Sequence, residues 1–306
     1  MIPEEETARE VLVGPDSVTW KFASDVRLYL VMLYPLLMQV AHPTVGAGVR
    51  DFSDFDRRPL QRLLRTLDYV SLLVYGGEEA IAAGRRLRNL HKGFTGVRED
   101  GERYYALEPT AYAWVHATLL HSYVTGHRQF GRPMRPAQIE AFYREYRDLG
   151  ALIGVRAGAL PDTWTEFQDY FEYVSDTELV ATESVHRVLG TVKLDGPPLI
   201  PMPSMIWTVT RIPARRALWL GGVGLMAPRL RRRLGIPWTS ADQRAVSNLG
   251  RLTRALTPVL PSRLQILGPT QLRWRERAIA RGPLGAQGST APARRAQAQL
   301  RAGPPG

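Results

Sequence analysis

His91 is the residue whose type and position best suit a metal or cofactor ligand. It stands at the end of an expected helix over residues 78–92, on the face that carries Arg88, and Leu87 and Leu90 flank it. An apolar collar keeps an imidazole neutral, which is the form that ligates iron. Arg88, one turn earlier, is placed to pair with a haem propionate. The spacing alone favours a core histidine that is hydrogen-bonded to a backbone carbonyl.

A second group of candidate residues lies on an expected helix over residues 59–75. Arg62, Arg65 and Thr66 follow the i, i+3, i+4 spacing that puts side chains on one helix face, and Tyr69 continues that face. Two cations and a hydroxyl beside an apolar stripe suit a pocket that polarises bound oxygen. On pattern alone, a solvated arginine face explains the same residues more simply.

The other histidines indicate structural roles. His116 lies in a nearly uniformly apolar segment, so we expect it to be buried and hydrogen-bonded. His121 and His127 do not form an i, i+4 pair with it, which is the spacing of a helical metal site. His42 precedes Pro43 at a helix end, where a packing or capping role is expected.

Two further motifs compete with this interpretation. Glu183 and His186 form one E-x-x-H element, but a di-iron carboxylate bundle needs two such elements and two further glutamates. The segment 222–227 fits a loose dinucleotide-binding pattern with Asp242 at a suitable distance. It lacks alternating strands and helices around it, so its signal is weak.

The amino-acid composition excludes several classes of metal and cofactor site. The 306 residues include no cysteine, which excludes disulfides, thiolate metal sites and covalent c-type haem attachment. The formal net charge is +11, and its excess is almost entirely arginine. The local peak at residues 229–233 has no interleaved aromatic residues and matches no nucleic-acid-binding motif, so we expect no nucleic-acid partner.

Helical periodicity dominates the chain and predicts an all-α fold. The expected helices cover residues 18–39, 59–75, 78–92, 109–125, 136–149, 163–176, 178–189 and 205–226, and a last one begins at Ser240. A glycine-rich loop over 45–48 and a polar connection over 98–103 are expected between them. The predicted organisation is an N-terminal arm (1–17), one large domain (18–281) and a disordered basic tail (282–306).

The sequence shows no export signal, so the expected location is the cytoplasm. The longest nearly apolar runs, 28–38 and 217–227, are shorter than the roughly 20 residues of a membrane span. Residues 212–234 mix Trp219 with leucines and arginines, a composition compatible with lying in a lipid interface. Peripheral membrane association is therefore an alternative.

Several segments together resemble one oxygenase family. These are residues 37–49, Ser53-Asp-Phe55, Arg62-Leu-Leu-Arg-Thr66, His91 within Leu90-His-Lys-Gly-Phe94, Tyr105–Pro109 and Trp114–Thr118. The family is that of latex clearing protein, a rubber oxygenase, and of the MpaB oxygenase of mycophenolic acid biosynthesis. The similarity spans roughly residues 20 to 255.

The resemblance implies a globin-like helical core that holds haem b and uses dioxygen to cleave an isoprenoid carbon–carbon double bond. His91 matches the proximal haem ligand, Arg88 a propionate-binding arginine, and Arg62 and Thr66 distal residues important for activity. Arg65 departs from the rubber-cleaving pattern, which has lysine there; a guanidinium is not expected to coordinate iron. An acid upstream of the second helix is also implied, with Asp51 and Asp54 as candidates.

The expected function is a haem-b-dependent oxygenase that acts with dioxygen on an apolar olefin. Since the rubber oxygenases are secreted, a small terpenoid or similar olefin inside the cell suits this chain better than an external polymer. The alternatives are a haem-binding or gas-sensing module without turnover and a membrane-peripheral basic helical protein.

Overall fold

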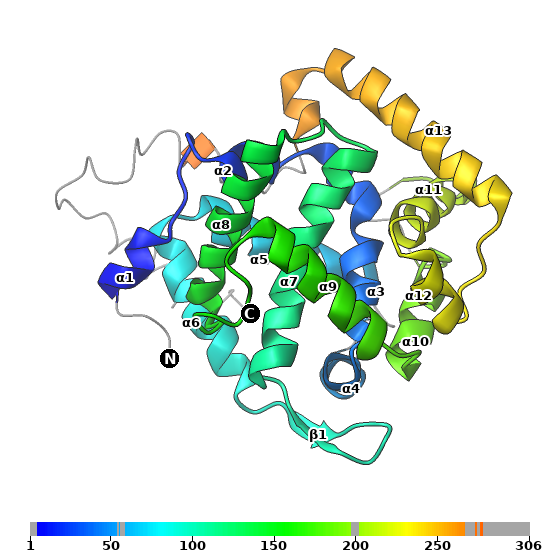
Figure 1. Cartoon of the computed structure of the whole chain (residues 1–306). Coiled ribbons are helices and arrows are strands. Elements are labelled where there is room, and N and C mark those ends of the chain that lie inside the picture. Colours follow the sequence, from blue (N-terminus) through cyan, green and yellow to red (C-terminus); the bar gives the residue numbers. More distant parts are fainter. Residues whose placement is uncertain are drawn as a thin grey trace, which may run out of the picture.

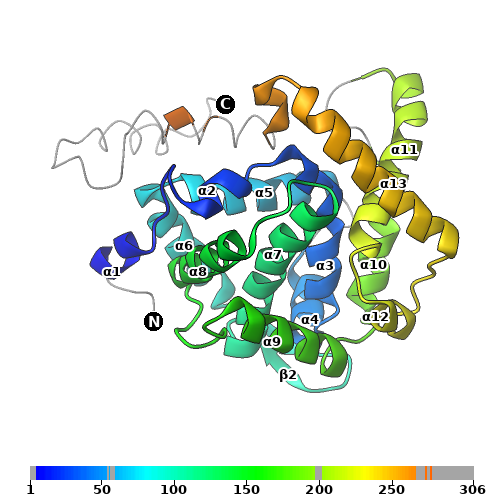
Figure 2. The same cartoon turned by 45° about the horizontal axis from the view of Figure 1, so that its top comes forward.

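The computed structural model describes residues 5–53, 55, 59–196, 202–266, 273, 276 and 277. This described part is mostly helical, with thirteen α-helices and one β-hairpin (Figures 1 and 2). The helices are α1 Glu5–Glu10, α2 Val18–Phe22, α3 Leu33–Val40, α4 Pro43–Phe52, α5 Pro59–Tyr75, α6 Glu78–His91, α7 Pro109–Gln129, α8 Pro136–Ile153, α9 Trp164–Thr177, α10 Glu183–Thr191, α11 Ser204–Val223, α12 Pro228–Arg233 and α13 Ser240–Leu256. Strands β1 (Thr95–Val97) and β2 (Arg103–Tyr105) pair antiparallel, and a 3-10 helix, η1, covers Val26–Val31.

Helix α7 lies at the centre of the fold (Figure 1). It starts on Pro109, and the Glu108 carboxylate accepts hydrogen bonds from the backbone N–H groups of Thr110 and Ala111. Its side chains are buried on most sides, as an apolar helix without a polar face requires. Helices α3, α8 and η1 pack around it, and the buried Trp114 indole donates to the Met38 carbonyl at 2.9 Å.

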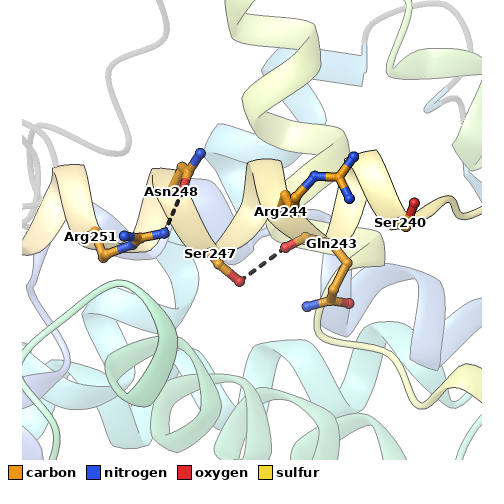
Figure 3. Close-up of a pocket in the computed structure, with 6 residues that line it drawn as sticks. All are labelled: Ser240, Gln243, Arg244, Ser247, Asn248 and Arg251. Carbon is orange, nitrogen blue, oxygen red and sulfur yellow. Dashed lines mark hydrogen bonds between the residues drawn. The ribbon is translucent and has the colours of Figure 1, made fainter.

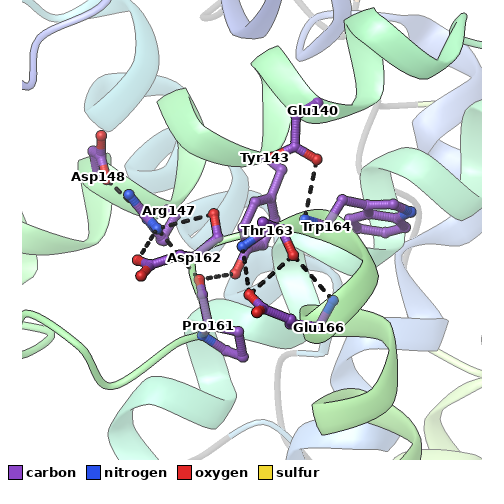
Figure 4. Close-up of polar contacts among 9 residues, drawn as sticks. All are labelled: Glu140, Tyr143, Arg147, Asp148, Pro161, Asp162, Thr163, Trp164 and Glu166. Atoms are coloured by element: carbon purple, nitrogen blue, oxygen red, sulfur yellow. Dashed lines mark hydrogen bonds and ion pairs between the residues drawn. The ribbon is translucent and has the colours of Figure 1, made fainter.

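The corner between α8 and α9 is fixed by a compact polar network (Figure 4). Thr163 and Glu166 form a capping box at the start of α9, and Glu140 accepts a hydrogen bond from the Trp164 backbone N–H at 3.1 Å. Tyr143 donates its hydroxyl to the Pro161 carbonyl at 2.6 Å. These bonds satisfy the free N–H groups of the α9 terminus and hold that helix against α8.

Glycine allows two helices that border the His91 region to approach closely. A Cβ added to Gly84 on α6 would lie 1.9 Å from the backbone oxygen of Leu152 on α8. No side-chain movement relieves a clash with backbone, so the two helices would have to separate. The contact between α6 and α8 therefore requires glycine at this position.

Gly84→Ala should lower the free energy of unfolding by about 2 kcal/mol or more, because overpacking here displaces backbone. Gly93→Ala is the control, since an added Cβ at Gly93 meets nothing within 4 Å. Urea unfolding followed by circular dichroism measures both variants. Equal stability of the two would contradict the inferred α6–α8 contact.

The predicted helices are confirmed, except that the one over 178–189 begins only at Glu183 and that three further places differ. The expected helix over 18–39 is divided into α2, η1 and α3, because Asp25 accepts the Arg27 backbone N–H and starts a new turn there. The glycine-rich loop over 45–48 was a wrong prediction, since those residues lie inside α4. Pro43 at its first turn begins this helix, and Gly46 lets it pack on the Val40 carbonyl.

The third difference is the polar connection over 98–103, which belongs to the β1–β2 hairpin. Its register pairs Thr95 with Tyr105 and Val97 with Arg103. The predicted basic tail, 282–306, lies outside the described residues, and the domain boundaries stay predictions. In the described part, no single helix is long and apolar enough to cross a membrane; one bent pair, Val26–Val40 with Pro43–Phe52, passes by length and composition.

Candidate functional site

His91 is the last residue of α6, and its ring is held in a defined tautomer. The Nδ1 atom lies 2.7 Å from the backbone oxygen of Leu87. Because a carbonyl oxygen can only accept, Nδ1 carries the hydrogen and donates it. In the neutral ring the lone pair is then on Nε2, for which the described residues provide no hydrogen-bond donor. This is the arrangement of a metal-ligating histidine whose second nitrogen is oriented by a backbone carbonyl.

The surroundings keep His91 neutral. Burial lowers its pKa below the usual 6.5, the hydrogen bond to Leu87 opposes this, and the Arg62 guanidinium lowers the pKa further. The charge on α5 therefore acts on the imidazole at the end of α6. A neutral imidazole at neutral pH is the form needed for coordination.

Two aromatic rings lie next to the imidazole, and a third extends their surface. The rings of Phe94 and Tyr112 have centroids 5.2 Å and 6.0 Å from that of His91. Phe52, at the end of α4, stacks on Phe94 at 4.2 Å and remains 41% exposed. Of the two leucines predicted to form an apolar collar, Leu90 is 60% exposed, whereas Leu87 is half-buried and packs against the core. Aromatic residues provide the rest of the apolar surface.

Arg88 lies one turn before His91 and is half-buried beside the end of α8. Its Nη1 donates to the Gly154 backbone oxygen at 3.4 Å. Gly154 has a φ of +89°, and a Cβ there would lie 2.6 Å from Arg88 Nη1. Because Gly154 has no Cβ, the Arg88 guanidinium has room to lie against the carbonyl end of α8. Burial raises the pKa of nearby Tyr112 to about 12, and the Arg88 charge opposes that shift.

Arg62, Arg65 and Thr66 lie on α5, and all three are exposed. Only Arg62 is near enough to His91 to influence its pKa. The Thr66 hydroxyl donates to the Arg62 backbone oxygen at 3.1 Å, one turn earlier in the same helix. Tyr69, further along, donates to the Ala83 carbonyl at 2.5 Å and so holds α5 against α6.

Asp51, the candidate acid upstream of α5, is occupied by neighbouring groups. Its Oδ1 lies 2.7 Å from Arg50 Nε, and Tyr104 donates to its Oδ2 at 2.8 Å. The hydrogen bond from Arg50 is the largest cause that holds the Asp51 pKa below its usual range. A carboxylate with a lowered pKa is a weak base, and these hydrogen bonds tie Asp51 to the hairpin; its role as the implied acid stays a prediction. Asp54, the other candidate, lies outside the described residues.

Comparison with known proteins agrees with the resemblance found in the sequence. Residues 20–255 match the model of the family described as "ER-bound oxygenase mpaB/B'/Rubber oxygenase, catalytic domain". The chain belongs to this oxygenase family. Similar proteins include the uncharacterized proteins Rv2237 of Mycobacterium tuberculosis and Mb2261 of Mycobacterium bovis. Each is 24% identical over 258 residues, covering 82% of this chain and 98% of the relative. No solved structure matches significantly.

The competing motifs find structural explanations in this member of the oxygenase family. No group of three or more His, Asp or Glu residues in the described ranges could hold a metal ion, so the Glu183–His186 element gains no support as a di-iron site. Gly222 lies inside α11 and packs on Leu33, with no preceding strand in the described chain. Asp242 belongs to the capping box of α13 with Thr239. The dinucleotide-binding interpretation is therefore wrong.

His116 is buried and hydrogen-bonded, as predicted. Its Nε2 lies 2.7 Å from the Tyr146 backbone oxygen, and burial lowers its pKa to about 4. His42 occupies the N-cap position of α4 and places Nε2 3.2 Å from a Glu178 carboxylate oxygen. The packing role predicted for His42 thus involves a carboxylate partner from the end of α9.

Acidification should destabilise this protein through His116. In the unfolded chain its pKa is near 6.5, so the unfolded state binds the proton first as pH falls, and stability is lost between about pH 6.5 and 4. At pH 5 this histidine alone should cost about 2 kcal/mol relative to pH 7. Urea unfolding at the two pH values measures the loss. His116→Gln should remove that part of the pH dependence, and an unchanged pH dependence would contradict the assignment.

The aromatic neighbours of His91 are the site residues that the sequence analysis missed. Phe94 follows the helix end by three residues, a spacing that could have drawn attention to it. Tyr112 and Phe52 come from α7 and α4, and no sequence pattern links them to His91. Only the packing of these helices brings them together.

Proposed function

We propose that this member of the oxygenase family uses haem b, bound through His91, to oxidise an apolar olefin with dioxygen. The observation that carries the proposal is the His91 tautomer. Nδ1 donates to the Leu87 carbonyl, so the lone pair of the neutral ring is on Nε2, the atom that would hold the iron of a bound haem. The family assignment supplies the oxygenase class.

The residues around His91 fit this cofactor. Phe94 and Tyr112 provide apolar ring surface beside the imidazole, and the exposed face of Phe52 extends it. Arg88 is a half-buried cation whose only hydrogen bond in the described chain, at 3.4 Å, is long, so it can pair with a propionate carboxylate. We infer that the helices around α7 form a globin-like core for this group.

When bound, the haem would supply the electron chemistry with dioxygen; His91 would hold its iron, and the protein would add hydrogen-bond donors and an apolar surface. Arg62 provides a fixed positive charge on the α5 side, close enough to influence His91. Thr66 provides a hydroxyl one turn further along the same face. Their role is to orient oxygen and to stabilise negative charge that develops on it. Arg65 carries a guanidinium, which is not expected to coordinate iron, so it contributes charge rather than a ligand.

We propose a small isoprenoid or similar olefin as the substrate, with cleavage of its carbon–carbon double bond as the reaction. The apolar aromatic surface next to His91 supports an apolar ligand, and the rubber oxygenases of the family support a reaction on isoprenoid double bonds.

Two measurements test the proposal. The purified protein, with haem supplied, should show a Soret band, and its oxygen uptake should depend on an olefin from a terpenoid panel. Haem binding without olefin-dependent oxygen uptake would favour the gas-sensing alternative. A protein that binds no haem would refute the proposed cofactor.

A further inference from the structure

A groove between α10 and α11 combines an apolar floor with cations. It has a volume of about 470 Å³ and is lined by Leu189, Val192, Lys193, Ile212, Arg215, Arg216 and Trp219. The lining residues of α11 are Ile212, Arg215, Arg216 and Trp219. Their i, i+3/i+4, i+7 spacing puts them on one face of the helix, which forms one wall of the groove. The C-terminal end of α10 and the residues after it form the other wall. A groove of this size is in the range of small-molecule sites.

The cations at this groove are incompletely neutralised. Lys193 and Arg215 are exposed, and neither side chain has a hydrogen-bond or ion-pair partner in the described chain. Arg216 pairs with Asp242 at 2.5 Å, and Arg211, one residue before Ile212, pairs with Asp195 at 3.2 Å. The net charge around the groove is +2, because it has four cations (Lys193, Arg211, Arg215 and Arg216) and two carboxylates (Asp195 and Asp242).

The apolar part of the groove is just as well defined. Val192 is 7% exposed and forms the floor, where the half-buried Leu189 and Trp219 continue the hydrophobic core to the surface. Ile212 remains 58% exposed at the edge. A ligand with an apolar chain and an anionic head would cover Ile212 and Trp219 and neutralise Lys193 and Arg215 at the same time.

The hollow along α13 provides a contrast (Figure 3). Its volume is about 610 Å³, and it is lined by Ser240, Gln243, Arg244, Ser247, Asn248 and Arg251. All six lining residues are polar and come from one helix, and Arg251 donates to the Asn248 side chain at 2.6 Å. This hollow offers cations, and none of its lining side chains is aliphatic or aromatic, so it serves as the matched control.

We propose that the α10–α11 groove is a binding site for an anionic amphiphile, with a carboxylate or phosphate head on Lys193 and Arg215 and an apolar chain on Val192, Ile212 and Trp219. The site is separate from the proposed haem site. In both overall views, α6 lies on the opposite side of α3 and α7 from α10 and α11 (Figures 1 and 2). The inference therefore does not depend on the proposed function.

The test uses the absence of cysteine from the chain. An Ile212→Cys variant can carry a single environment-sensitive dye in the groove, and Leu252→Cys, on exposed α13, can carry the same dye outside it. Laurate below its micelle concentration should displace the dye at position 212 and leave the dye at position 252 unaffected. Dodecanol, which has the same chain length without the charge, should act at least about tenfold more weakly.

Charge variants decide the outcome. In the 212-labelled protein, Lys193→Gln with Arg215→Gln should weaken the laurate response about tenfold or more, whereas Arg244→Gln with Arg251→Gln removes equal charge and should leave it unchanged. Both pairs are exposed, and circular dichroism verifies their folding. The His91→Ala protein should retain the laurate response, which keeps this test distinct from that of the haem site.

A parallel titration with vesicles identifies the source of the head group. A response to phosphatidylglycerol vesicles without a response to free laurate, lost in the Lys193/Arg215 variant, would support the site with a membrane lipid as its ligand. Equal responses to laurate and dodecanol would overturn the proposal. So would a wild-type response in the Lys193/Arg215 variant, or no response to either laurate or vesicles.

Discussion

His91→Ala is expected to purify as a folded helical protein that has lost most of its haem. The imidazole provides the proposed bond to iron, and its Nδ1–H···O bond to Leu87 stays within one turn of α6, so its loss breaks no hydrogen bond to another helix. Changes to residues that merely orient a metal ligand cost 10–100-fold in affinity, and loss of the ligand itself should cost at least about tenfold. Haem content by pyridine haemochrome and helicity by circular dichroism measure the two effects.

Two controls separate ligation from stability. His116→Ala removes a histidine that is 2% exposed and bonded to the Tyr146 carbonyl, so it should lower stability while leaving the spectrum of the bound haem unchanged. Imidazole added to the His91→Ala protein should restore part of the haem binding, because it can occupy the space left by the side chain. Full haem occupancy with an unchanged spectrum in His91→Ala would remove His91 from the site.

The bounds of a helix were predictable from the sequence where residues at its own ends determine them. Pro59 at the first turn and the apolar stripe that follows predicted the helix that became α5, over 59–75. Acids at the start of α6 and Gly93 after it predicted that helix to within one residue. Residues 45–48 were not predictable, because Gly46 favours a loop by propensity and becomes helical through its contact with the Val40 carbonyl.

The candidate site was likewise predictable only in part. The helical spacing indicated that Arg62 and Thr66 share a face, and the apolar context indicated a neutral His91. That Arg62 acts on His91 depends on how α5 packs against α6, where Tyr69 donates to the Ala83 carbonyl. Tyr112 reaches His91 from α7, a contact that requires the tertiary structure. Side chains from one helix were therefore predictable, and those assembled from several helices were not.

Arg62→Ala and Thr66→Val are expected to retain haem and to lose turnover, each by about 10²–10³-fold, the usual effect of removing one preorganised donor. Neither residue is proposed to bind iron. Arg62 lies close enough to lower the His91 pKa, so its charge acts on the proposed iron ligand. The Thr66 hydroxyl donates to the Arg62 carbonyl, and its hydrogen can rotate toward another acceptor.

Thr66→Val keeps the side-chain shape and removes only the hydroxyl, and the chain provides a matched control for it. Thr208 on α11 makes the same bond to the residue four positions earlier, from its hydroxyl to the Ser204 carbonyl at 2.9 Å, and it is also exposed. Thr208→Val should therefore leave turnover unchanged. Arg144→Ala, an exposed arginine on α8, serves the same purpose for Arg62→Ala.

Haem content and oxygen uptake on terpenoid olefins, measured on the same preparations, separate cofactor loss from loss of the donors. Lower uptake at full haem loading in both variants, with both controls at wild-type rates, is the expected pattern. If Arg62→Ala and Thr66→Val both keep wild-type turnover at full haem loading, the distal assignment is wrong. The exposed face of α5 would then be a solvated arginine surface, and the donors for oxygen would have to come from another helix near His91.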